Sequence, residues 1–249
     1  MRMDGNTILI TGGSSGIGRG LAEAFQKRGN KVIIGGRTEA RLKEVAAANP
    51  GMEYLVVDCA RKESIEAAAA EAERRWPGLN VVFNNAGVQK TFDFAGGAVD
   101  ERALEEEIDT NVYGVVRVAA AFLPLLKRQR EAWVVNTSSG LAFVPMAVFP
   151  VYCATKAFVH SFSMSLRVQL KETSVRVVEL APPYVATELD RDHKDRASAH
   201  QAMPLAEYVA AAMKELESGA DEAAVGFAKM GRDAVMNDKV MGIFARLNG

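Results

Sequence analysis

The chain of 249 residues has the length of one α/β domain. Hydrophobic residues make up 49% of it and charged residues 24%, which excludes a disordered chain, and the net charge of −1 provides no bulk positive field for binding nucleic acid or anionic lipid. No stretch of about 18 apolar residues lacks a charge, so the sequence predicts no membrane span.

Short apolar runs alternate with longer segments of helical spacing. Most of the runs are apolar throughout, which is typical of parallel strands buried on both faces. The runs expected as strands are Thr7–Ile10, Lys31–Gly35, Glu53–Val57, Asn80–Phe83, Trp133–Asn136 and Val175–Leu180, with a weaker seventh around 224–228. The segments expected as helices are Gly18–Arg28, Glu39–Ala48, Lys62–Trp76, Leu104–Arg128 and Val151–Lys171. This order predicts an α/β fold, a doubly wound parallel sheet of about seven strands with helices on both faces.

No linker divides the chain, so we expect a single domain over residues 1–249. Its most polar irregular segment, residues 188–203, is interpreted either as a solvated loop or as a flap over a substrate site. No signal-peptide pattern precedes the first apolar run, and the two cysteines, Cys59 and Cys153, do not make a disulfide framework. We expect a cytoplasmic protein.

A glycine-rich turn, Thr11–Gly18, joins the first expected strand to a helical pattern. Its glycines, Gly12, Gly16 and Gly18, have the spacing G-x-x-x-G-x-G. A phosphate group needs close backbone approach and free N–H donors at a helix N-terminus, and glycine has no Cβ to obstruct either. The turn therefore predicts phosphate binding, although a plain tight turn fits the same spacing.

The end of the second strand indicates which dinucleotide is bound. NAD sites usually place an acid there to bind the ribose 2′-hydroxyl, whereas this chain has Arg37. Arginine pairs with a 2′-phosphate, so the sequence predicts NADP (NADPH) in preference to NAD. The alternative is a solvent-facing arginine at a helix start. Ser14 and Ser15 stand where the glycine loop usually carries a second basic residue, so we expect a modest preference.

Tyr152 and Lys156 lie four residues apart in a segment of helical spacing, and therefore on one helix face. Tyrosine has a reference pKa of about 10, and a nearby lysine cation favours tyrosinate and lowers that pKa. The pair suits a proton transfer that accompanies hydride transfer.

Other polar residues follow neighbouring strands, where open α/β sheets bind their ligands. Ser139 follows the fifth expected strand, and the sequence Asn84–Gly87 follows the fourth. A serine hydroxyl there can donate to a carbonyl oxygen. Asn111 lies inside the long helical segment, where a kink or a surface position is the alternative interpretation.

Together and in this order, these motifs resemble the short-chain dehydrogenase/reductase family, which has a Rossmann-type sheet and an Asn–Ser–Tyr–Lys tetrad. The similarity extends from Thr7 to Leu189, and within the family it is greatest to the DltE-like oxidoreductases. The resemblance implies an NADP(H)-dependent oxidoreductase that interconverts a carbonyl and an alcohol by hydride transfer. Tyr152 would be the general acid in reduction and the general base in oxidation.

The resemblance also implies roles for the other residues. Lys156 would lower the pKa of Tyr152 and bind the nicotinamide ribose, Ser139 rather than Ser138 would hold the carbonyl oxygen, and Asn111 would keep a water in a proton relay to Lys156. Asp58 would contact the adenine. The residues implied to bind the cofactor are Gly12, Ser14, Ser15, Gly16, Ile17, Gly18, Arg37, Asp58, Cys59, Asn85, Ala86, Gly87, Tyr152, Lys156, Pro182, Val185 and Thr187.

One segment departs from the family's pattern. A Pro-Gly pair commonly follows the sixth strand in the family, ahead of a threonine that meets the nicotinamide carboxamide. Here Pro183 replaces the glycine between Pro182 and Thr187. Proline fixes φ and lacks an N–H group, so we expect a stiffer turn.

The uncharged segment 141–151 is expected to line the substrate pocket, with Tyr184, Phe92 and Phe94. An apolar pocket suits a small uncharged aldehyde, ketone or alcohol. Packing of these side chains in the core or at a subunit interface is the alternative.

Family members commonly form dimers or tetramers through the two long helices, here near 104–128 and 151–171, so we expect a homodimer or homotetramer. The apolar stripe of residues 236–247 is interpreted as packing on the body or on a second subunit in preference to a membrane surface. His160, His193 and His200 lack a metal-ligand spacing with the cysteines, so no metal site is expected.

Two other functions fit the same fold. A dehydratase or epimerase would retain its cofactor, but the roughly 60 residues after Thr187 leave little room for its substrate domain. A cofactor-binding sensor would not need the complete set of Asn111, Ser139, Tyr152 and Lys156.

Overall fold

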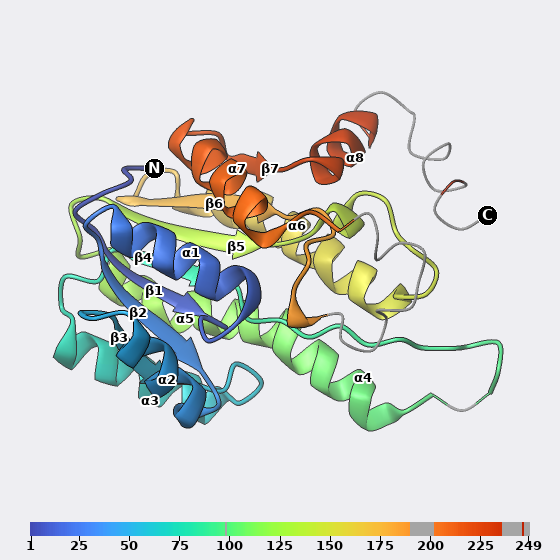
Figure 1. Cartoon of the computed structure of the whole chain (residues 1–249), viewed down its shortest axis with the longest axis horizontal. Helices are drawn as coiled ribbons and strands as arrows, with labels where there is room; N and C mark the ends of the chain where they lie inside the picture. Colours follow the sequence, from blue (N-terminus) through green and yellow to red (C-terminus); the bar gives the residue numbers. More distant parts are fainter. Residues whose placement is uncertain (98, 190–201, 236–245, 247–249) are drawn as a thin grey trace.

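The computed structural model describes residues 1–97, 99–189, 202–235 and 246 (Figure 1). At its centre is one parallel sheet of seven strands in the order β3-β2-β1-β4-β5-β6-β7. The strands are β1 (Thr7–Thr11), β2 (Lys31–Gly36), β3 (Glu53–Val56), β4 (Val81–Asn84), β5 (Ala132–Thr137), β6 (Val175–Ala181) and β7 (Glu222–Ala224). The doubly wound parallel sheet predicted from the sequence is confirmed.

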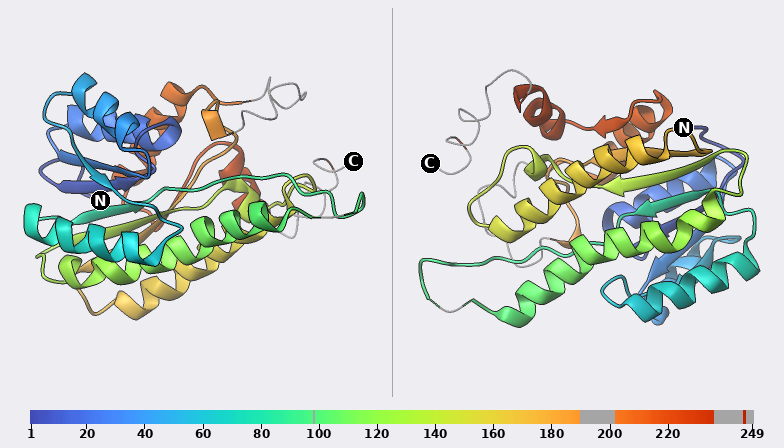
Figure 2. Two further views of the ribbon diagram at one scale, coloured as in Figure 1. Left: turned by 90° about the horizontal axis from the view of Figure 1, so that it is seen from below. Right: turned by 180° about the vertical axis from the view of Figure 1, so that it is seen from behind.

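Helices cover both faces of the sheet as two layers (Figure 2). One layer holds α1 (Gly16–Lys27), α2 (Glu39–Ala48) and α7 (Leu205–Glu217), and the other holds α3 (Lys62–Arg75), α5 (Gly114–Leu126) and α6 (Pro150–Leu170). The other helical elements of the described residues are α4 (Glu101–Ile108), the π-helical turn η1 (Asp109–Tyr113), the short turn η2 (Gly140–Ala142) and α8 (Phe227–Val235).

The two-sided burial of the strands explains their continuous apolar runs. In β1, Ile8 and Ile10 pack toward α1 and α7, while Leu9 packs toward the layer of α3 and α5. Successive side chains of a strand point to opposite faces, so a strand covered on both faces needs apolar residues at every position. All six residues of β5 are buried for the same reason.

The weak seventh strand was misplaced by the sequence pattern. It lies at Glu222–Ala224 rather than around 224–228, and residues 227–235 form α8. An apolar run of a few residues does not distinguish a buried strand from the start of a helix, and the pairing of β7 with β6 decides between them.

The segment expected as one helix, Leu104–Arg128, is three elements. A π-helical turn, η1 (Asp109–Tyr113), separates α4 from α5. By length and hydropathy the stretch Glu101–Leu126 could also cross a membrane, but α5 buries its apolar residues against the sheet. Core helices of globular proteins share that composition.

Two expectations from the sequence lie largely outside the described residues. They are the flap at 188–203, of which 190–201 is not described, and the stripe at 236–247, of which only Arg246 is described. Where the chain resumes, Met203 pairs with Val185, so the segment after β6 and the segment before α7 are held together.

Candidate active site

The carboxyl ends of β1, β4, β5 and β6 meet at one edge of the sheet, and the chain segments that follow them carry most of the residues singled out above (Figure 1). The order reverses between β1 and β4, since β2 lies on one side of β1 and β4 on the other. Such a reversal leaves a crevice between the two loops, which is where open α/β sheets bind ligands.

The glycine turn has the geometry of an open backbone cradle. Gly12 has a φ of +67°, and a Cβ there would lie 2.9 Å from the Cα of Ala86. A Cβ on Gly18 would meet the carbonyl oxygen of Gly12 and lie 2.6 Å from Asn85 Nδ2. Only glycine fits these positions, and the backbone at the start of α1 stays accessible to a phosphate.

The turn is held to the end of β4 by Thr11. The backbone N–H groups of Asn85 and Ala86 donate to Thr11 Oγ1, at 3.0 and 3.1 Å. The Asn85 side chain donates to the backbone oxygen of Thr11 at 3.0 Å. Asn85 and Ala86, expected as cofactor contacts, therefore also fix the two walls of the crevice to each other.

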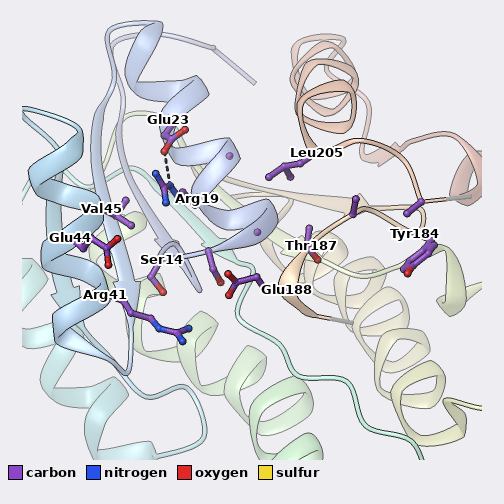
Figure 3. Close-up of a pocket in the computed structure, with 15 residues that line it drawn as sticks. Ser14, Arg19, Glu23, Arg41, Glu44, Val45, Tyr184, Thr187, Glu188 and Leu205 are labelled. Carbon is purple, nitrogen blue, oxygen red and sulfur yellow. Dashed lines mark hydrogen bonds and ion pairs between the residues drawn. The ribbon is translucent and has the colours of Figure 1, made fainter. Parts of the chain in front are cut away.

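A cleft of about 1100 Å³ opens next to this turn (Figure 3). Its walls come from the glycine turn and α1, from α2, and from the segment after β6. They include Ser14, Ser15, Gly16, Arg19, Glu23, Arg41, Glu44, Tyr184, Thr187 and Glu188. A Cβ at Gly16 would lie 3.3 Å from the Cβ of Thr187, so the segment after β6 closes directly over the glycine turn.

Arg37, expected at a 2′-phosphate, already has a carboxylate partner. Its Nη1 lies 3.1 Å from Glu106 Oε1, and its side chain is 60% exposed. Glu106 also pairs with Lys90 at 3.0 Å. Arg41, which the sequence analysis missed, lies four residues further on, on α2, and lines the cleft with Ser14 (Figure 3).

Tyr152 and Lys156 occupy one face of α6, as their spacing predicts. Both are buried, and Lys156 Nζ lies 5.4 Å from the Tyr152 ring centre. Lys156 Nζ donates to the backbone oxygen of Thr137 at 2.9 Å, which ties α6 to the end of β5. Ser139 lies just beyond β5 and shares a hydrogen bond with the Tyr152 hydroxyl. The structure thus brings Ser139, Tyr152 and Lys156 together.

Asn111 lies in the π-helical turn and is 1% exposed. Its Oδ1 accepts from the N–H of Val88 at 2.9 Å, and its Nδ2 donates to the oxygen of Val88 and to Thr155 on α6. A Cβ on Gly87 would lie 3.2 Å from Asn111 Oδ1 and 3.5 Å from Lys156 Nζ. Asn111 therefore joins the loop after β4 to the helix that carries the tyrosine and lysine.

Burial is the largest cause of the pKa shifts of Tyr152 and Lys156. It raises the pKa of Tyr152 and lowers the pKa of Lys156 to about 8. Both shifts arise because each group loses hydration of its charged form. That Lys156 lowers the pKa of Tyr152 stays a prediction.

The remaining cofactor candidates differ in how their side chains lie. Asp58, after β3, accepts from the N–H of Ala60 at 3.1 Å and is partly exposed. Cys59 turns into the core between the sheet and α5, where burial raises the pKa of its thiol to about 12. Ile17 packs against the core below α1. Cys59 can therefore offer a ligand only its backbone.

The Pro-Pro segment after β6 is anchored on both sides. The oxygen of Pro182 accepts from the N–H of Gly140 at 2.8 Å, and Pro183 lies against Gly226. The backbone groups of Tyr184 and Ala186 bond to Met203 at 2.9 Å, with Val185 buried between them. These contacts fix the path of the chain from β6 to Thr187.

The apolar segment 141–151 divides between the site and the core. Leu141, Met146 and Val148 pack around Phe149 and Tyr152. Another part, Phe143 and Val144, packs instead against α8. Of the other expected lining residues, Phe92 is buried, Phe94 is exposed, and Tyr184 lines the cleft.

A second polar cluster, which the sequence analysis missed, lies behind the site. Glu179 is fully buried in β6 and bonds to Ser138 Oγ and, at 2.7 Å, to His160 Nδ1. Ser138 therefore faces Glu179, whereas Ser139 faces Tyr152. Ligand atoms of His160, Glu179 and Glu222 lie within 4.8 Å of one another, but each oxygen of Glu179 already has a hydrogen-bond partner and Glu222 lies 3.8 Å from Arg232. We assign no metal to this cluster.

Fold and site define a Rossmann-type protein in which a glycine turn and a tyrosine–lysine pair lie at the same edge of the sheet. The short chain dehydrogenase family matches residues 6–198. The chain is 45% identical to the uncharacterised oxidoreductase DltE of Bacillus subtilis over 223 residues, which cover 89% of this chain and 88% of that relative. It belongs to the short chain dehydrogenase family of oxidoreductases.

Two further relatives carry a cofactor in their names. The NADP-dependent 3-hydroxy acid dehydrogenase YdfG of Escherichia coli is 34% identical over 179 residues, 72% of each chain. The structure of a short chain dehydrogenase from Burkholderia cenocepacia in complex with NADP matches with a TM-score of 0.85 and 28% identity, over 99% of both chains.

Proposed function

We propose that the protein is an NADP(H)-dependent oxidoreductase that interconverts an uncharged aldehyde or ketone and its alcohol. The observation that carries the proposal is the meeting of Ser139, Tyr152 and Lys156 at the sheet edge that also forms the glycine turn. Membership of the short chain dehydrogenase family supports the reaction class, and the NADP in the names of two relatives supports the cofactor.

The residues of the cleft fit a dinucleotide. The Cβ-free surface of Gly12, Gly16 and Gly18 would receive the pyrophosphate at the start of α1. Arg41 and Arg37 would hold the 2′-phosphate, and the buried Lys156 would reach the nicotinamide ribose. When bound, NADP supplies the hydride donor or acceptor of the reaction.

The proton is handled by the chain itself. In reduction, Tyr152 gives its hydroxyl proton to the carbonyl oxygen, and in oxidation the tyrosinate takes the proton from the alcohol. Ser139 holds the same oxygen through its hydroxyl. The ammonium group of Lys156 stabilises the tyrosinate, and Asn111 positions the loop after β4 beside both groups. Leu141, Met146 and Val148 offer an apolar wall, which suits an uncharged substrate.

Replacement of Tyr152 by phenylalanine tests the proposal. With NADPH and a panel of uncharged aldehydes and ketones, we expect Tyr152→Phe to lower kcat at least about 100-fold, the usual contribution of a general acid. NADPH binding, followed by nicotinamide fluorescence, should persist. Tyr113→Phe is the matched control, because Tyr113 is exposed and lies outside the site. Full activity of Tyr152→Phe would refute the proposal.

A further inference from the structure

Glu107 is a buried carboxylate that the mechanism above does not use. It lies at the end of α4, one turn before Asn111, and its side chain is fully buried. Its Oε1 accepts from the backbone N–H of Lys90 at 3.1 Å. Its Oε2 is buried and has no hydrogen-bond partner among the residues that the structure describes. A buried carboxylate oxygen without a partner is costly, so its retention calls for a reason.

The titratable groups around Glu107 include two residues of the active site, Tyr152 and Lys156. Helix α4 packs against α6, and the charge of Glu107 acts on Tyr152, Cys153 and Lys156 there. From the other elements, Lys90 in the loop after β4 and Glu106 on α4 also act on it. Glu106 is paired with Arg37 and Lys90 at the surface, so Glu107 is the acid that faces inward.

Among the residues that the structure describes, Glu107 is the one charged group that acts on the buried Lys156. The Lys156 nitrogen donates to one neutral acceptor, the backbone oxygen of Thr137. Burial lowers its pKa, and Glu107 is the charge that acts in the opposite direction. A lysine in such a place loses its proton unless an opposite charge is near.

We propose that Glu107 is a positioning residue of the reaction, a buried counter-charge that keeps Lys156 in its ammonium form beside Tyr152. The proposal rests on the function proposed above, because it assigns Glu107 a part in the same proton transfer. Burial raises the pKa of Glu107 to about 7, so it is ionised on the alkaline side of neutrality, where Lys156 would otherwise deprotonate. The negative charge of Glu107 also raises the pKa of Tyr152 directly, which opposes tyrosinate formation. Its favourable effect therefore acts through Lys156.

The direct test measures the titration of Lys156 without any substrate. Carbon NMR of protein labelled at lysine Cε follows this group, with Lys156→Arg to assign its signal. We expect a midpoint near pH 8 in the wild type. In Glu107→Gln it should fall to lower pH, because the negative charge that raises the pKa of Lys156 is removed. Glu105→Gln, an exposed acid on the same helix, should leave it in place. An unchanged midpoint in folded Glu107→Gln would overturn the proposal.

A reciprocal measurement covers the case in which Glu107→Gln does not fold. Coupling between two groups acts equally in both directions, so Lys156→Met should raise the pKa of Glu107, followed in protein labelled at the glutamate carboxyl. An unchanged pKa of Glu107 would again contradict the proposal. Glu107→Asp, which retains the charge, should keep the Lys156 midpoint closer to that of the wild type than Glu107→Gln does.

The kinetic consequence separates this proposal from the function it rests on. The alkaline fall of kcat/KM should move to lower pH in Glu107→Gln and stay in place in Glu105→Gln. If Tyr152→Phe keeps full carbonyl reductase activity while Lys156 and Glu107 still titrate as a pair, the counter-charge role of Glu107 is supported and the proposed reaction is wrong. If Tyr152→Phe is inactive and Lys156 titrates independently of Glu107, the proposed reaction is supported and the counter-charge role of Glu107 is wrong.

Discussion

Two arginines four residues apart, Arg37 and Arg41, differ in what their guanidinium groups already bind. Arg37 is paired with Glu106, so a 2′-phosphate must compete with a carboxylate for it. Arg41 lines the cleft beside Ser14, and no carboxylate pairs with it in the part of the chain that the structure describes. The other cation in the cleft wall, Arg19, is paired with Glu23 at 2.7 Å. Arg41 is therefore the better placed of the three for a phosphate.

We expect Arg41→Ala to weaken the binding of NADPH about tenfold, or about 1.4 kcal/mol, and to leave that of NADH nearly unchanged, because only NADPH carries the 2′-phosphate. Parallel fluorescence titrations with both cofactors measure this, with Arg37→Ala for comparison. Lys43→Ala, on the same helix but paired with Glu39, is the control. Equal losses for NADPH and NADH would count against a phosphate contact.

At the scale of elements, the turn that connects β1 to α1 must lie very close to the end of β4. The glycine spacing alone is compatible with any tight turn. In the folded chain, Gly18 has no Cβ, so its backbone can lie directly against the Asn85 side chain and the backbone of Gly12. Packing of this density leaves no room for one more carbon atom.

Gly18→Ala should destabilise the protein by about 1–3 kcal/mol, the usual cost of overpacking, which corresponds to several degrees in Tm. NADPH affinity should fall with it, because the turn that would receive the pyrophosphate must shift. Differential scanning calorimetry and the cofactor titration measure the two effects. Gly78→Ala is the control, since a Cβ there meets nothing within 4 Å. A Gly18→Ala protein with the Tm and affinity of the wild type would show that the turn can adjust freely.

The break between α4 and α5 shows the limit of sequence patterns at this scale. Helical spacing continues through residues 104–128, so the sequence predicts one helix. The π-helical turn at Asp109–Tyr113 buries Asn111, where it bonds to Val88 and Thr155. These partners lie 23 and 44 residues away in the chain, so no local propensity reveals them.

At the scale of the whole molecule, the outer surface of α6 carries several exposed apolar side chains. Phe158, Met164 and Val168 are 38%, 47% and 66% exposed, and Phe158 stacks on Phe162. Tyr113, in the neighbouring turn between α4 and α5, is 51% exposed. Large apolar side chains gathered on one side of a molecule indicate an interaction surface. We propose that this surface joins two copies of the chain, as expected from the long helices.

Val168→Glu should then shift the protein from dimer or tetramer toward a smaller species, because a buried unpaired carboxylate in the interface is costly. Light scattering coupled to size-exclusion chromatography gives the mass of each variant. Met230→Glu is the control, since Met230 is 62% exposed on α8. If the wild type is a monomer, or if Val168→Glu keeps its assembly, the interface lies elsewhere or does not exist.

The sequence by itself determined the order of β1 to β6 and of the helical segments between them, the glycine turn, and the pairing of Tyr152 with Lys156. These features depend on local spacing: apolar residues at every position of strands that are buried on both faces, glycines where no Cβ fits, and a four-residue separation on a helix. Only the tertiary structure decided the position of β7, the π-helical turn, the partner of Arg37, and the presence of Arg41, Glu107 and Glu179 near the site. Each of these depends on contacts between residues far apart in the chain. Burial at those contacts, which no local pattern measures, governs the titration of Tyr152, Lys156 and Glu107.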